Sequence, residues 1–461
     1  MFERFRNMAE KDAPTDLGLP VRPAHMMRPT GDEKVKHYTN LKVALHQKLL
    51  EMINLSTIDR LTREQLMREI SPIVSDLLSS DGIALNASEY VKLLDELLDE
   101  VLGLGPIEPL LKDPTVSDIL VNTHKKVYVE RFGQLEETPI RFKDDRHLMR
   151  IVQKIVGAVG RRVDESQPWV DARLPDGSRV NALVPPCAVD GPLLSIRKFS
   201  AKPLTTELMI ENGTISPQIA ELLEAIVRCR LNVLISGGTG SGKTTLLNAL
   251  SSMISNRERI ITIEDTAELQ LQQEHVGRME SRPKNIEGTG EVTQRDLLRN
   301  ALRMRPDRIV VGEVRGAEVL DMLQAMNTGH DGSMTTIHAN SPRDALTRLE
   351  HMIAMTGLEM PLKSLRSQIA AAIHIVVQVQ RLSDGRRRIV SLQEIVGMES
   401  DVVSMQEIYK FERAGLDKDG NVIGQHRATG IRPKFAKQLD ELGVQLPSDL
   451  FSNDIVRSAA E

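Results

Sequence analysis

The spacing of apolar residues changes along the chain, and the first regular spacing covers residues 36–102. Leucine and isoleucine recur there every three or four positions, which is the period of one buried helical face. The pattern predicts three amphipathic helices, with capping-box signatures at Thr62 with Gln65 and at Asn86 with Glu89. The expected buried positions are Leu41, Leu45, Leu49 and Ile53, then Leu66, Ile70, Ile73 and Leu77, then Leu94, Leu97 and Val101. Such a helical bundle is typical of a docking or spacing module.

Residues 1–35 contain several prolines and no apolar period. A segment that cannot bury apolar surface gains too little from folding to offset its lost conformational entropy. We therefore predict that residues 1–35 are mostly disordered.

A second pattern begins at residue 103, where short apolar strands alternate with turns. The expected elements are strands at 116–122 and 126–133, a helix over 147–159, a hairpin over 170–186 and a strand at 193–199. Asp176 and Gly177 are typical of the hairpin turn. These elements predict an α+β domain over 103–203, followed by a polar linker over 204–215.

Strands and helices alternate regularly over residues 216–400, within a predicted domain that extends with its C-terminal extension to residue 461. The apolar strands LNVLIS, RIITIED, RIVVGEV and SMTTIHA are separated by helical segments. This alternation predicts an α/β domain with a parallel sheet covered by helices. A further helix is expected near the end of the chain, in the segment KFAKQLDELG (434–443).

Composition narrows the range of functions. The net charge is -5 and aromatic residues make up 3% of the chain, which disfavours a nucleic-acid-binding role. Two cysteines are too few for a four-thiolate zinc site and suit a reducing cytosol. No apolar run reaches about 18 residues. We therefore expect a cytoplasmic protein that reaches a membrane only through partners.

The strongest chemical signal is a match to GxxxxGK[ST] between an apolar strand and a helix. Glycines permit positive φ angles, so successive amides can point at phosphate oxygens beside a helix N-terminus. We expect Lys243 to reach the β- and γ-phosphates of ATP and the Thr244 hydroxyl to bind Mg²⁺. The residues predicted to hold the nucleotide are Gly237, Gly238, Thr239, Gly240, Ser241, Gly242, Lys243, Thr244 and Thr245. The alternative is a glycine-rich turn with an exposed lysine.

Acidic residues follow two of the later strands, where ligands of open parallel sheets bind. Glu264 ends one strand and Glu268 follows one turn later, either as catalytic acids or as a helix cap. Glu313 follows Gly312, which occupies the usual metal-binding aspartate position. We assign Glu313 to activating water, directly or through the magnesium shell, with Arg315 orienting it. Both Glu264 and Glu313 are thus candidate metal-binding acids.

Histidines and arginines supply the remaining candidates. His330 and His338 flank one apolar strand, and His338 is the better candidate for a γ-phosphate sensor. Three arginines recur every four residues on one helical face, either as a solvated stripe or as contacts to a neighbouring subunit's nucleotide: Arg295, Arg299 and Arg303. In the preceding domain, one or more of Arg173, Arg179 and Arg197 are expected to contact phosphate across the domain cleft.

These segments resemble a known superfamily. GGTGSGKTT, IEDTAEL, VGEVRG and GHDGSMTTIHAN resemble, in order, the Walker A, Asp box, Walker B and His box of the secretion ATPase superfamily, which serves type II secretion, type IV pili and type IV secretion. The upstream segments GLGPIEPLL, VSDILVN, RLPDGSRVNA and SIRKF resemble its tight-adherence (Tad/Flp) pilus branch, the CpaF-like ATPases. The resemblance covers about residues 36–461.

The resemblance implies a RecA-like ATPase domain in a homohexameric ring at the bacterial inner membrane. Hydrolysis of ATP would move pilin through a polytopic platform protein to assemble a pilus, and the resemblance leaves open whether it also drives retraction. The implied roles are phosphate and metal binding by Lys243 and Thr244, acid catalysis by Glu264, Glu268 and Glu313, the His-box function of His338, and arginine contacts from Arg173, Arg179 and Arg197. The tetracysteine zinc module of the type II branch is absent from the sequence, so no structural zinc is expected.

Three alternatives remain open at this point. The same enzyme could serve type IV secretion, moving effectors or conjugative DNA. A nucleic-acid motor shares the RecA-like core and would show salt-dependent stimulation by single-stranded DNA. A nucleotide-binding assembly protein would bind ATP without turnover.

Overall fold

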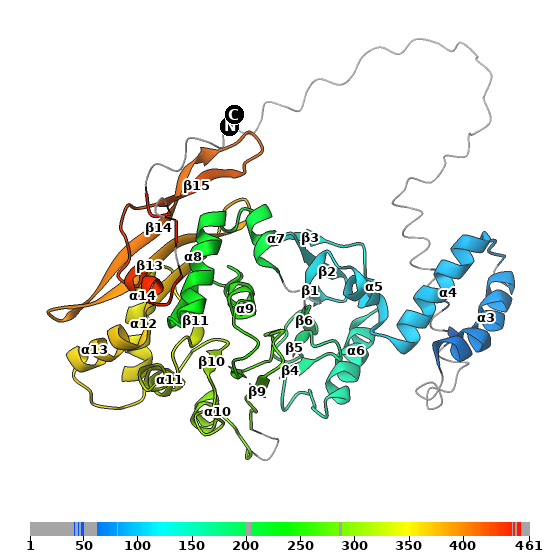
Figure 1. Ribbon diagram of the computed structural model, residues 1–461. Coiled ribbons are helices and arrows are strands. Elements are labelled where there is room, and N and C mark those ends of the chain that lie inside the picture. The colour runs from blue at the N-terminus through cyan, green and yellow to red at the C-terminus, as the bar shows by residue number, and fades with distance from the viewer. Residues whose placement is uncertain are drawn as a thin grey trace, which may run out of the picture. The chain divides into compact units, whose positions relative to one another are not determined.

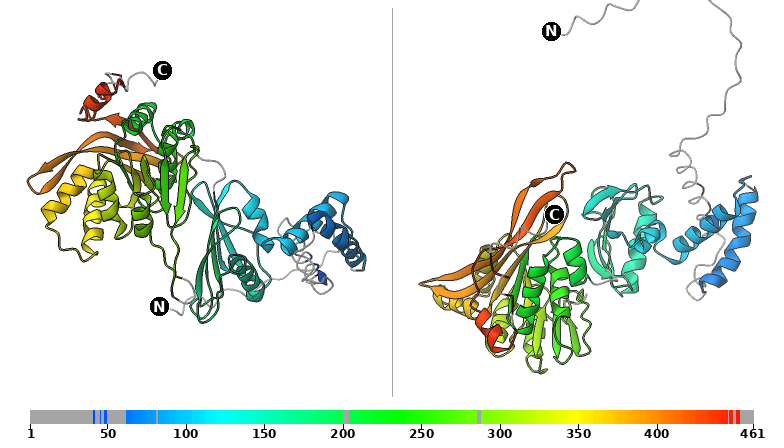
Figure 2. Two further views of the ribbon diagram at one scale, coloured as in Figure 1. Left: turned by 60° about the horizontal axis from the view of Figure 1, so that its bottom comes forward. Right: turned by 45° about the horizontal axis from the view of Figure 1, so that its top comes forward.

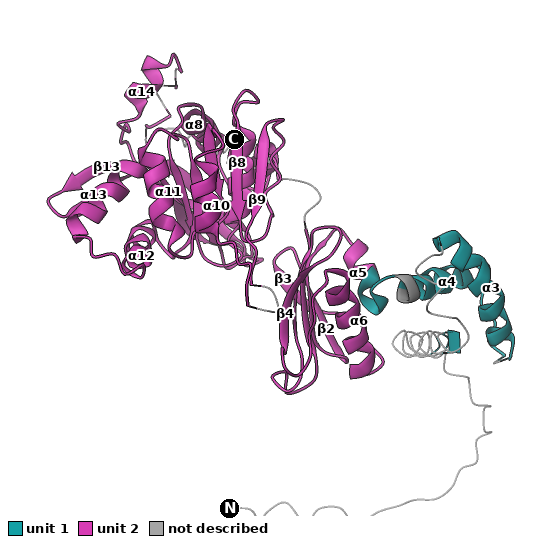
Figure 3. Ribbon diagram, turned by 90° about the horizontal axis from the view of Figure 1, so that it is seen from below, with its two compact units in different colours: residues 1–108 teal, residues 109–461 magenta. Residues whose placement is uncertain are grey.

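The structure is a computed structural model (Figure 1). It describes residues 62–80, 82–199, 204–284 and 288–444, and in addition residues 41, 45, 48, 49, 446, 447 and 450–452. The chain divides into two compact units, residues 1–108 and 109–461 (Figure 3). The disorder expected for residues 1–35 lies outside the described residues.

The first unit contains helices α3 (Arg63–Ser80) and α4 (Ala87–Leu102), followed by a short 3₁₀ turn at Gly105–Ile107. Both predicted capping boxes are confirmed. Thr62 and Gln65 exchange backbone-to-side-chain hydrogen bonds of 2.9 and 3.3 Å, and Asn86 and Glu89 do the same at 3.0 and 2.9 Å. Of the first expected helix, the described residues Leu45 and Leu49 are buried against α3 and α4.

The buried stripe of α3 differs in its second half from the prediction. Leu66 and Ile70 are buried as expected, but Val74 and Leu78 continue the stripe in place of Ile73 and Leu77, which are only partly buried. A spacing of four residues keeps these positions on the side that packs against α4. Ile53 and the side chain of Val101 lie outside the described residues.

Helix α5 (Glu108–Lys112) spans the boundary between the two units. The second unit then continues with a sheet that we call the N-terminal sheet. Within the described residues it has six strands in the order β3-β2-β1-β6-β5-β4, with every neighbouring pair antiparallel. The strands are β1 (Val116–Thr123), β2 (Lys126–Arg131), β3 (Gln134–Glu137), β4 (Trp169–Arg173), β5 (Arg179–Leu183) and β6 (Leu193–Arg197). Helix α6 (Asp145–Ala158) buries one apolar face in this domain. The four residues of β3 are all exposed, so no apolar alternation marked it in the sequence.

The segment expected to be a linker, 204–215, contains a helix instead. Helix α7 (Thr206–Glu211) is capped by the Thr205 side chain. Met209 and Ile215 are buried in the same core as the following helix, α8 (Pro217–Arg228). The segment is therefore not a polar linker throughout, because Leu204 and Ile210 also pack against this core.

The second sheet, which we call the phosphate-loop sheet, has the order β15-β14-β13-β12-β7-β11-β10-β8-β9 among the described residues. All pairs from β12 to β9 are parallel, and β13, β14 and β15 extend the sheet antiparallel. Its strands are β7 (Val233–Gly237), β8 (Ile260–Glu264), β9 (Val276–Glu280), β10 (Arg308–Val311), β11 (Met334–His338), β12 (Ile375–Arg381), β13 (Arg387–Glu399), β14 (Val402–Leu416) and β15 (Val422–Ala428). The predicted parallel α/β fold is confirmed.

Helices cover both faces of this sheet (Figures 1 and 2). One core joins α8 and α9 (Lys243–Ser252) to residues such as Val233 and Ile235, while the alternate residue Leu234 belongs to the opposite core. That second core contains α10 (Gln294–Ala301), α11 (Glu318–Asn327), α12 (Pro342–Ala354) and α13 (Leu362–Ala372). The expected C-terminal helix is α14 (Ala436–Glu441). In the described part of the chain, no helix combines the length and apolarity needed to span a membrane.

Candidate functional site

The loop between β7 and α9 is shaped by glycine conformations that other residues adopt at a cost. Gly240 and Gly242 have φ angles of +67° and +96°, and Gly242 is the N-cap of α9. A Cβ atom at Gly237 would collide with the Ser241 hydroxyl and lie 2.5 Å from the Val379 carbonyl oxygen. The Ser241 hydroxyl is buried and has no hydrogen-bond partner within the described residues. This is the backbone shape in which amides and a helix N-terminus bind phosphate.

The Lys243 side chain lies back along this loop. Its Nζ donates a hydrogen bond of 3.0 Å to the Gly238 carbonyl. Burial lowers the pKa of the Lys243 ammonium, and the Glu313 carboxylate opposes that shift. Thr244 and Thr245 follow in the first turn of α9, directly after the loop.

Polar residues gather where β8, β10 and β11 end, close to the loop. The His338 Nε2 and the Thr239 Oγ1 are 2.7 Å apart. The Arg315 Nε donates to Glu313 at 3.0 Å, and the same guanidinium lies 3.6 Å from Asp265. The structure therefore brings Glu313 and His338 to the edge of the sheet that holds the phosphate loop. His330 lies before β11, and its Nδ1 is buried without a partner among the described residues.

Glu264 is buried, with a relative exposure of 3%. Its Oε2 accepts hydrogen bonds from the backbone amides of Glu268 at 2.7 Å and Leu269 at 2.9 Å, while its Oε1 has no partner in the described region. Burial raises the pKa of the Glu264 carboxyl, and these two amides partly offset the shift. A Cβ at Gly312 would lie 3.0 Å from the Glu264 Cγ, so a larger residue at position 312 would make a tight contact with that side chain.

The three predicted arginines lie side by side on the N-terminal sheet. Arg179 is the register partner of both Arg173 and Arg197, so the three side chains share one face. Arg179 donates to Glu268 at 2.7 Å and to the Thr266 hydroxyl at 2.8 Å. Arg173 forms an ion pair of 3.0 Å with Glu280.

The register continues this row beyond the arginines. Arg197 is paired with Asp118, to which its Nε donates at 3.1 Å, and Asp118 is paired with Glu130. We call Arg173, Arg179, Arg197, Asp118 and Glu130 the charged row. Asp118 and Glu130 were not predicted from the sequence, because only the strand register brings them into line with the arginines.

The arginine stripe of α10 has a partner within this chain. Arg295 and Arg299 donate through Nε to the two oxygens of the Asp321 carboxylate, at 2.7 and 2.8 Å. Asp321 is 6% exposed. Two of the three arginines therefore neutralise a nearly buried acid of this chain, a contact that the sequence did not predict. Arg303 is exposed.

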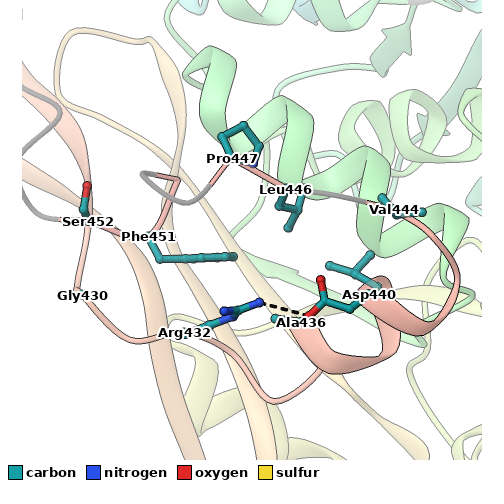
Figure 4. Close-up of a pocket in the computed structure, with 10 residues that line it drawn as sticks. Gly430, Arg432, Ala436, Asp440, Val444, Leu446, Pro447, Phe451 and Ser452 are labelled. Atoms are coloured by element: carbon teal, nitrogen blue, oxygen red, sulfur yellow. Dashed lines mark hydrogen bonds and ion pairs between the residues drawn. The ribbon is translucent and has the colours of Figure 1, made fainter.

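A pocket of about 340 Å³ lies near the C-terminal end of the described residues (Figure 4). Its lining includes Leu439, Leu446 and Phe451, and an Arg432–Asp440 ion pair of 3.1 Å crosses one side. None of its lining residues belongs to the phosphate loop or the charged row. We therefore consider this pocket separate from the site above.

The residues of the loop fit a magnesium-bound nucleotide better than a protein-only metal site. Among the described residues, no three His, Cys, Asp or Glu side chains are grouped as a ligand set. Mg²⁺ commonly takes one or two protein ligands and completes its shell with phosphate oxygens and water. The buried, unpartnered oxygens of Ser241 and Glu264 leave hydrogen-bonding capacity at the same edge of the sheet.

A parallel sheet with a phosphate loop after β7 and acids after the neighbouring strands defines a P-loop protein with a RecA-like domain. Residues 100–413 match the family model described as type II/IV secretion system protein, and the chain belongs to this family. The predicted membership of the secretion ATPase superfamily is confirmed.

Named relatives illustrate that membership. A putative conjugal transfer protein of Mycobacterium tuberculosis is 43% identical over 316 residues, which cover 67% of this chain and 89% of the relative. The type IV secretion system protein VirB11 of Bartonella henselae is 31% identical, with 63% of this chain and 92% of the relative covered. The solved VirB11 ATPase of Brucella suis is 30% identical, covers 62% of this chain and 91% of its own, and superposes with a TM-score of 0.34.

Proposed function

We propose that this chain hydrolyses Mg²⁺-bound ATP at the phosphate loop and that hydrolysis drives a membrane-associated assembly machine. The observation that carries this proposal is the loop itself. Gly240 and Gly242 hold left-handed φ angles, and Lys243 opens helix α9. A backbone of this shape has little use other than binding phosphate.

Binding of the triphosphate uses groups of the phosphate loop and of the neighbouring strand ends. The Lys243 ammonium exchanges the Gly238 carbonyl, 3.0 Å away, for oxygens of the β- and γ-phosphates. The Thr244 hydroxyl would hold Mg²⁺, with Glu313 and Glu264 as the acids that could complete its shell. When bound, the metal neutralises charge on the phosphate oxygens.

The attacking water is oriented by acids at the strand ends. Glu313 accepts the proton or positions the water, and Arg315 fixes the direction of its carboxylate. Glu264 also acts through the backbone, because its Oε2 holds the turn that presents Glu268. His338 responds to the γ-phosphate through Thr239, with which it shares a hydrogen bond of 2.7 Å.

The arginines provide positive charge from the N-terminal sheet. Arg179 already bonds Glu268, so γ-phosphate charge in the site competes with that acid for the same guanidinium. Removing one such donor from a transferring phosphoryl group costs several orders of magnitude in rate in other P-loop enzymes. Arg173 and Arg197 flank it in register and extend the same positive surface.

The test of the enzyme is steady phosphate release by the purified protein. We expect Lys243→Ala to lose ATP binding and Glu313→Gln to retain binding but lose turnover by about 10²-fold or more. Glu359→Gln removes an equal charge from an exposed loop and serves as the control. Turnover that survives in Lys243→Ala would reject the motor, and nucleotide binding without any turnover in the parent protein would favour a non-hydrolysing assembly protein.

The machine we propose is a Tad/Flp-type type IV pilus at the bacterial inner membrane, with the chain at its cytoplasmic face. The support is the resemblance of the segments upstream of the phosphate loop, together with the helical unit of α3 and α4. The partners are a polytopic platform protein and pilin. Stimulation by single-stranded DNA would instead indicate a nucleic-acid motor.

A type IV secretion ATPase is the second candidate, and the names of the relatives favour it. Deleting the gene separates the two. Loss of surface pili with unchanged DNA or effector transfer supports the pilus motor, and the reverse result supports secretion.

We also propose a homohexameric ring. An arginine supplied by a neighbouring subunit accelerates P-loop hydrolysis by about 10³–10⁵ in known cases. Turnover per subunit should therefore fall when the ring dissociates on dilution. A turnover that is flat across that range, with dissociation verified by mass photometry, would contradict the ring as the active form.

A further inference from the structure

Two arginines of the β12–β13 hairpin lie against the phosphate loop. Arg381 ends β12 and Arg387 begins β13, and they are direct register partners. The Arg387 Nε donates to the Gly240 carbonyl at 3.0 Å. A Cβ at Gly242 would lie 3.2 Å from the Arg387 Cδ, and one at Gly240 would lie 3.8 Å from an Arg381 terminal nitrogen. Both side chains therefore follow the loop on its hairpin side.

The same two arginines face one carboxylate of the charged row. Glu130 lies 3.8 Å from a terminal nitrogen of Arg381 and 3.8 Å from one of Arg387. Both distances exceed the length of a hydrogen bond. The Glu130 side chain is 19% exposed. At 3.8 Å its carboxylate attracts both guanidinium groups but forms a hydrogen bond with neither.

Positive charge is in excess at this point. Like charges directly opposite each other on neighbouring strands are unfavourable, and Arg197 lies close enough to Arg387 to add to the repulsion. Burial, and then Arg381, lower the pKa of the Arg387 guanidinium, while Glu130 and Asp118 oppose that shift. Among the described residues, Arg381 and Arg387 share the single Glu130 carboxylate at 3.8 Å, so a polyanion bound at the loop would supply negative charge that this acid does not.

We propose that Arg381 and Arg387 bind the α- and β-phosphates of the nucleotide and that Glu130 is their partner until the nucleotide binds. This inference rests on the proposed nucleotide function. The α/β position follows from the Gly242 contact, because the amides of this part of the loop bind the α- and β-phosphates whereas the loop lysine reaches the β and γ. Phosphate oxygens at hydrogen-bond distance replace a carboxylate at 3.8 Å.

This exchange has a consequence for the two sheets. Glu130 belongs to β2 of the N-terminal sheet, and the arginines belong to the phosphate-loop sheet. Nucleotide binding gives up the Glu130 ion pairs and so weakens one connection between the sheets. The charge of the bound diphosphate is thereby sensed by the N-terminal sheet, independently of the γ-phosphate.

The experiment measures affinities of the full-length protein for a fluorescent ADP and for ATPγS, both with Mg²⁺. Arg387→Ala is expected to weaken both ligands by about 10- to 100-fold, the range for a charge-assisted hydrogen bond, and Arg381→Ala by less. Arg386→Ala removes a charge from the exposed neighbouring position of the same turn and should bind like the parent. Glu130→Gln should tighten binding by about two- to fivefold, the range of a partly exposed ion pair.

A purely structural role for these residues would not produce tighter binding in Glu130→Gln. The gain should disappear when Glu130→Gln is combined with Arg381→Ala and Arg387→Ala. An Arg387→Ala affinity equal to that of Arg386→Ala overturns the proposal, and a loss confined to ATPγS overturns the α/β position. If the parent protein binds neither ligand, the proposed nucleotide function itself fails.

Discussion

The phosphate loop and the charged row are linked through Arg387, which contacts both Gly240 and Glu130, but they are built from different parts of the chain. The loop offers backbone amides whose directions are set by Gly240, Gly242 and the start of α9. The charged row offers side chains that are already engaged, such as Arg179 with Glu268 and Arg197 with Asp118. A backbone site needs little rearrangement to bind phosphate, whereas each arginine must first leave an acid.

This difference separates affinity from response. Preformed amides act at low entropic cost and favour tight binding. Ion pairs that compete with a ligand make the position of the N-terminal sheet depend on what the loop holds. We therefore expect substitutions in the loop to abolish nucleotide binding. Substitutions in the charged row should leave binding in place and lower turnover.

The largest expected effect comes from the loop. Gly237→Ala places a Cβ 2.5 Å from the Val379 carbonyl and against Ser241, so the loop or β12 must shift. We expect a loss of nucleotide affinity above about 100-fold and a decrease of about 1–3 kcal/mol in the free energy of unfolding. Gly238→Ala meets no heavy atom within 4 Å and should keep the parent's thermal stability. Equal melting temperatures for both variants would show that the loop is not tightly packed.

The charged row should show the opposite behaviour, with turnover lost and binding retained. Arg179→Ala removes hydrogen bonds to Glu268 and Thr266, and we expect kcat to fall by about 10²-fold or more with little change in KM. Arg173→Ala, which contacts Glu280 instead, should have a smaller effect. Because these side chains are partly exposed, the free energy of unfolding should change by less than about 1 kcal/mol. Unchanged turnover in Arg173, Arg179 and Arg197 variants would remove the arginine role altogether.

The sequence predicted local features much better than contacts between distant segments. The phosphate loop, the capping boxes at Thr62 and Asn86, and the strand-helix alternation are all encoded within a few neighbouring residues, and the structure contains each of them. Arg381, Arg387 and Glu130 were missed because their relation depends on register and on the packing of two sheets. No local pattern carries that information.

The same reason explains the other differences. Gly312 lies beside the Glu264 side chain, a close approach of two strands that no local pattern shows. The segment 204–215 is fixed by the burial of Met209 in a core formed mostly by later residues. Strands β13 to β15 alternate only partly between buried and exposed positions, and the prediction did not include them.

A pH-dependent effect should follow from the buried acid at the end of β8. Burial raises the pKa of Glu264 in the folded state, so the folded protein favours the protonated carboxyl. Its stabilising contribution is present below the unfolded-state pKa and is lost as pH rises through the raised folded-state pKa. Glu264→Gln should therefore be more stable than the parent at pH 8, with a difference that shrinks toward pH 4 in denaturant unfolding. The exposed Glu274→Gln is the control, and an identical pH slope in parent and Glu264→Gln would contradict the burial argument.

The smallest expected effect comes from Thr239, the residue of the phosphate loop that contacts the His338 side chain. Thr239 is exposed at the tip of the loop, and its hydroxyl shares a hydrogen bond of 2.7 Å with the His338 Nε2. Because a neutral hydrogen bond contributes about 0.5–1.5 kcal/mol net, Thr239→Ala should lower kcat by about 2- to 12-fold in single-turnover hydrolysis while ADP affinity stays near the parent's. A loss of ADP affinity as large as that of Gly237→Ala would mean that Thr239 belongs to the preformed loop. A fall in kcat alone would group Thr239 with the side chains that interact with the γ-phosphate. In that case Thr239 positions His338, and the loop amides keep their directions without the Thr239 hydroxyl.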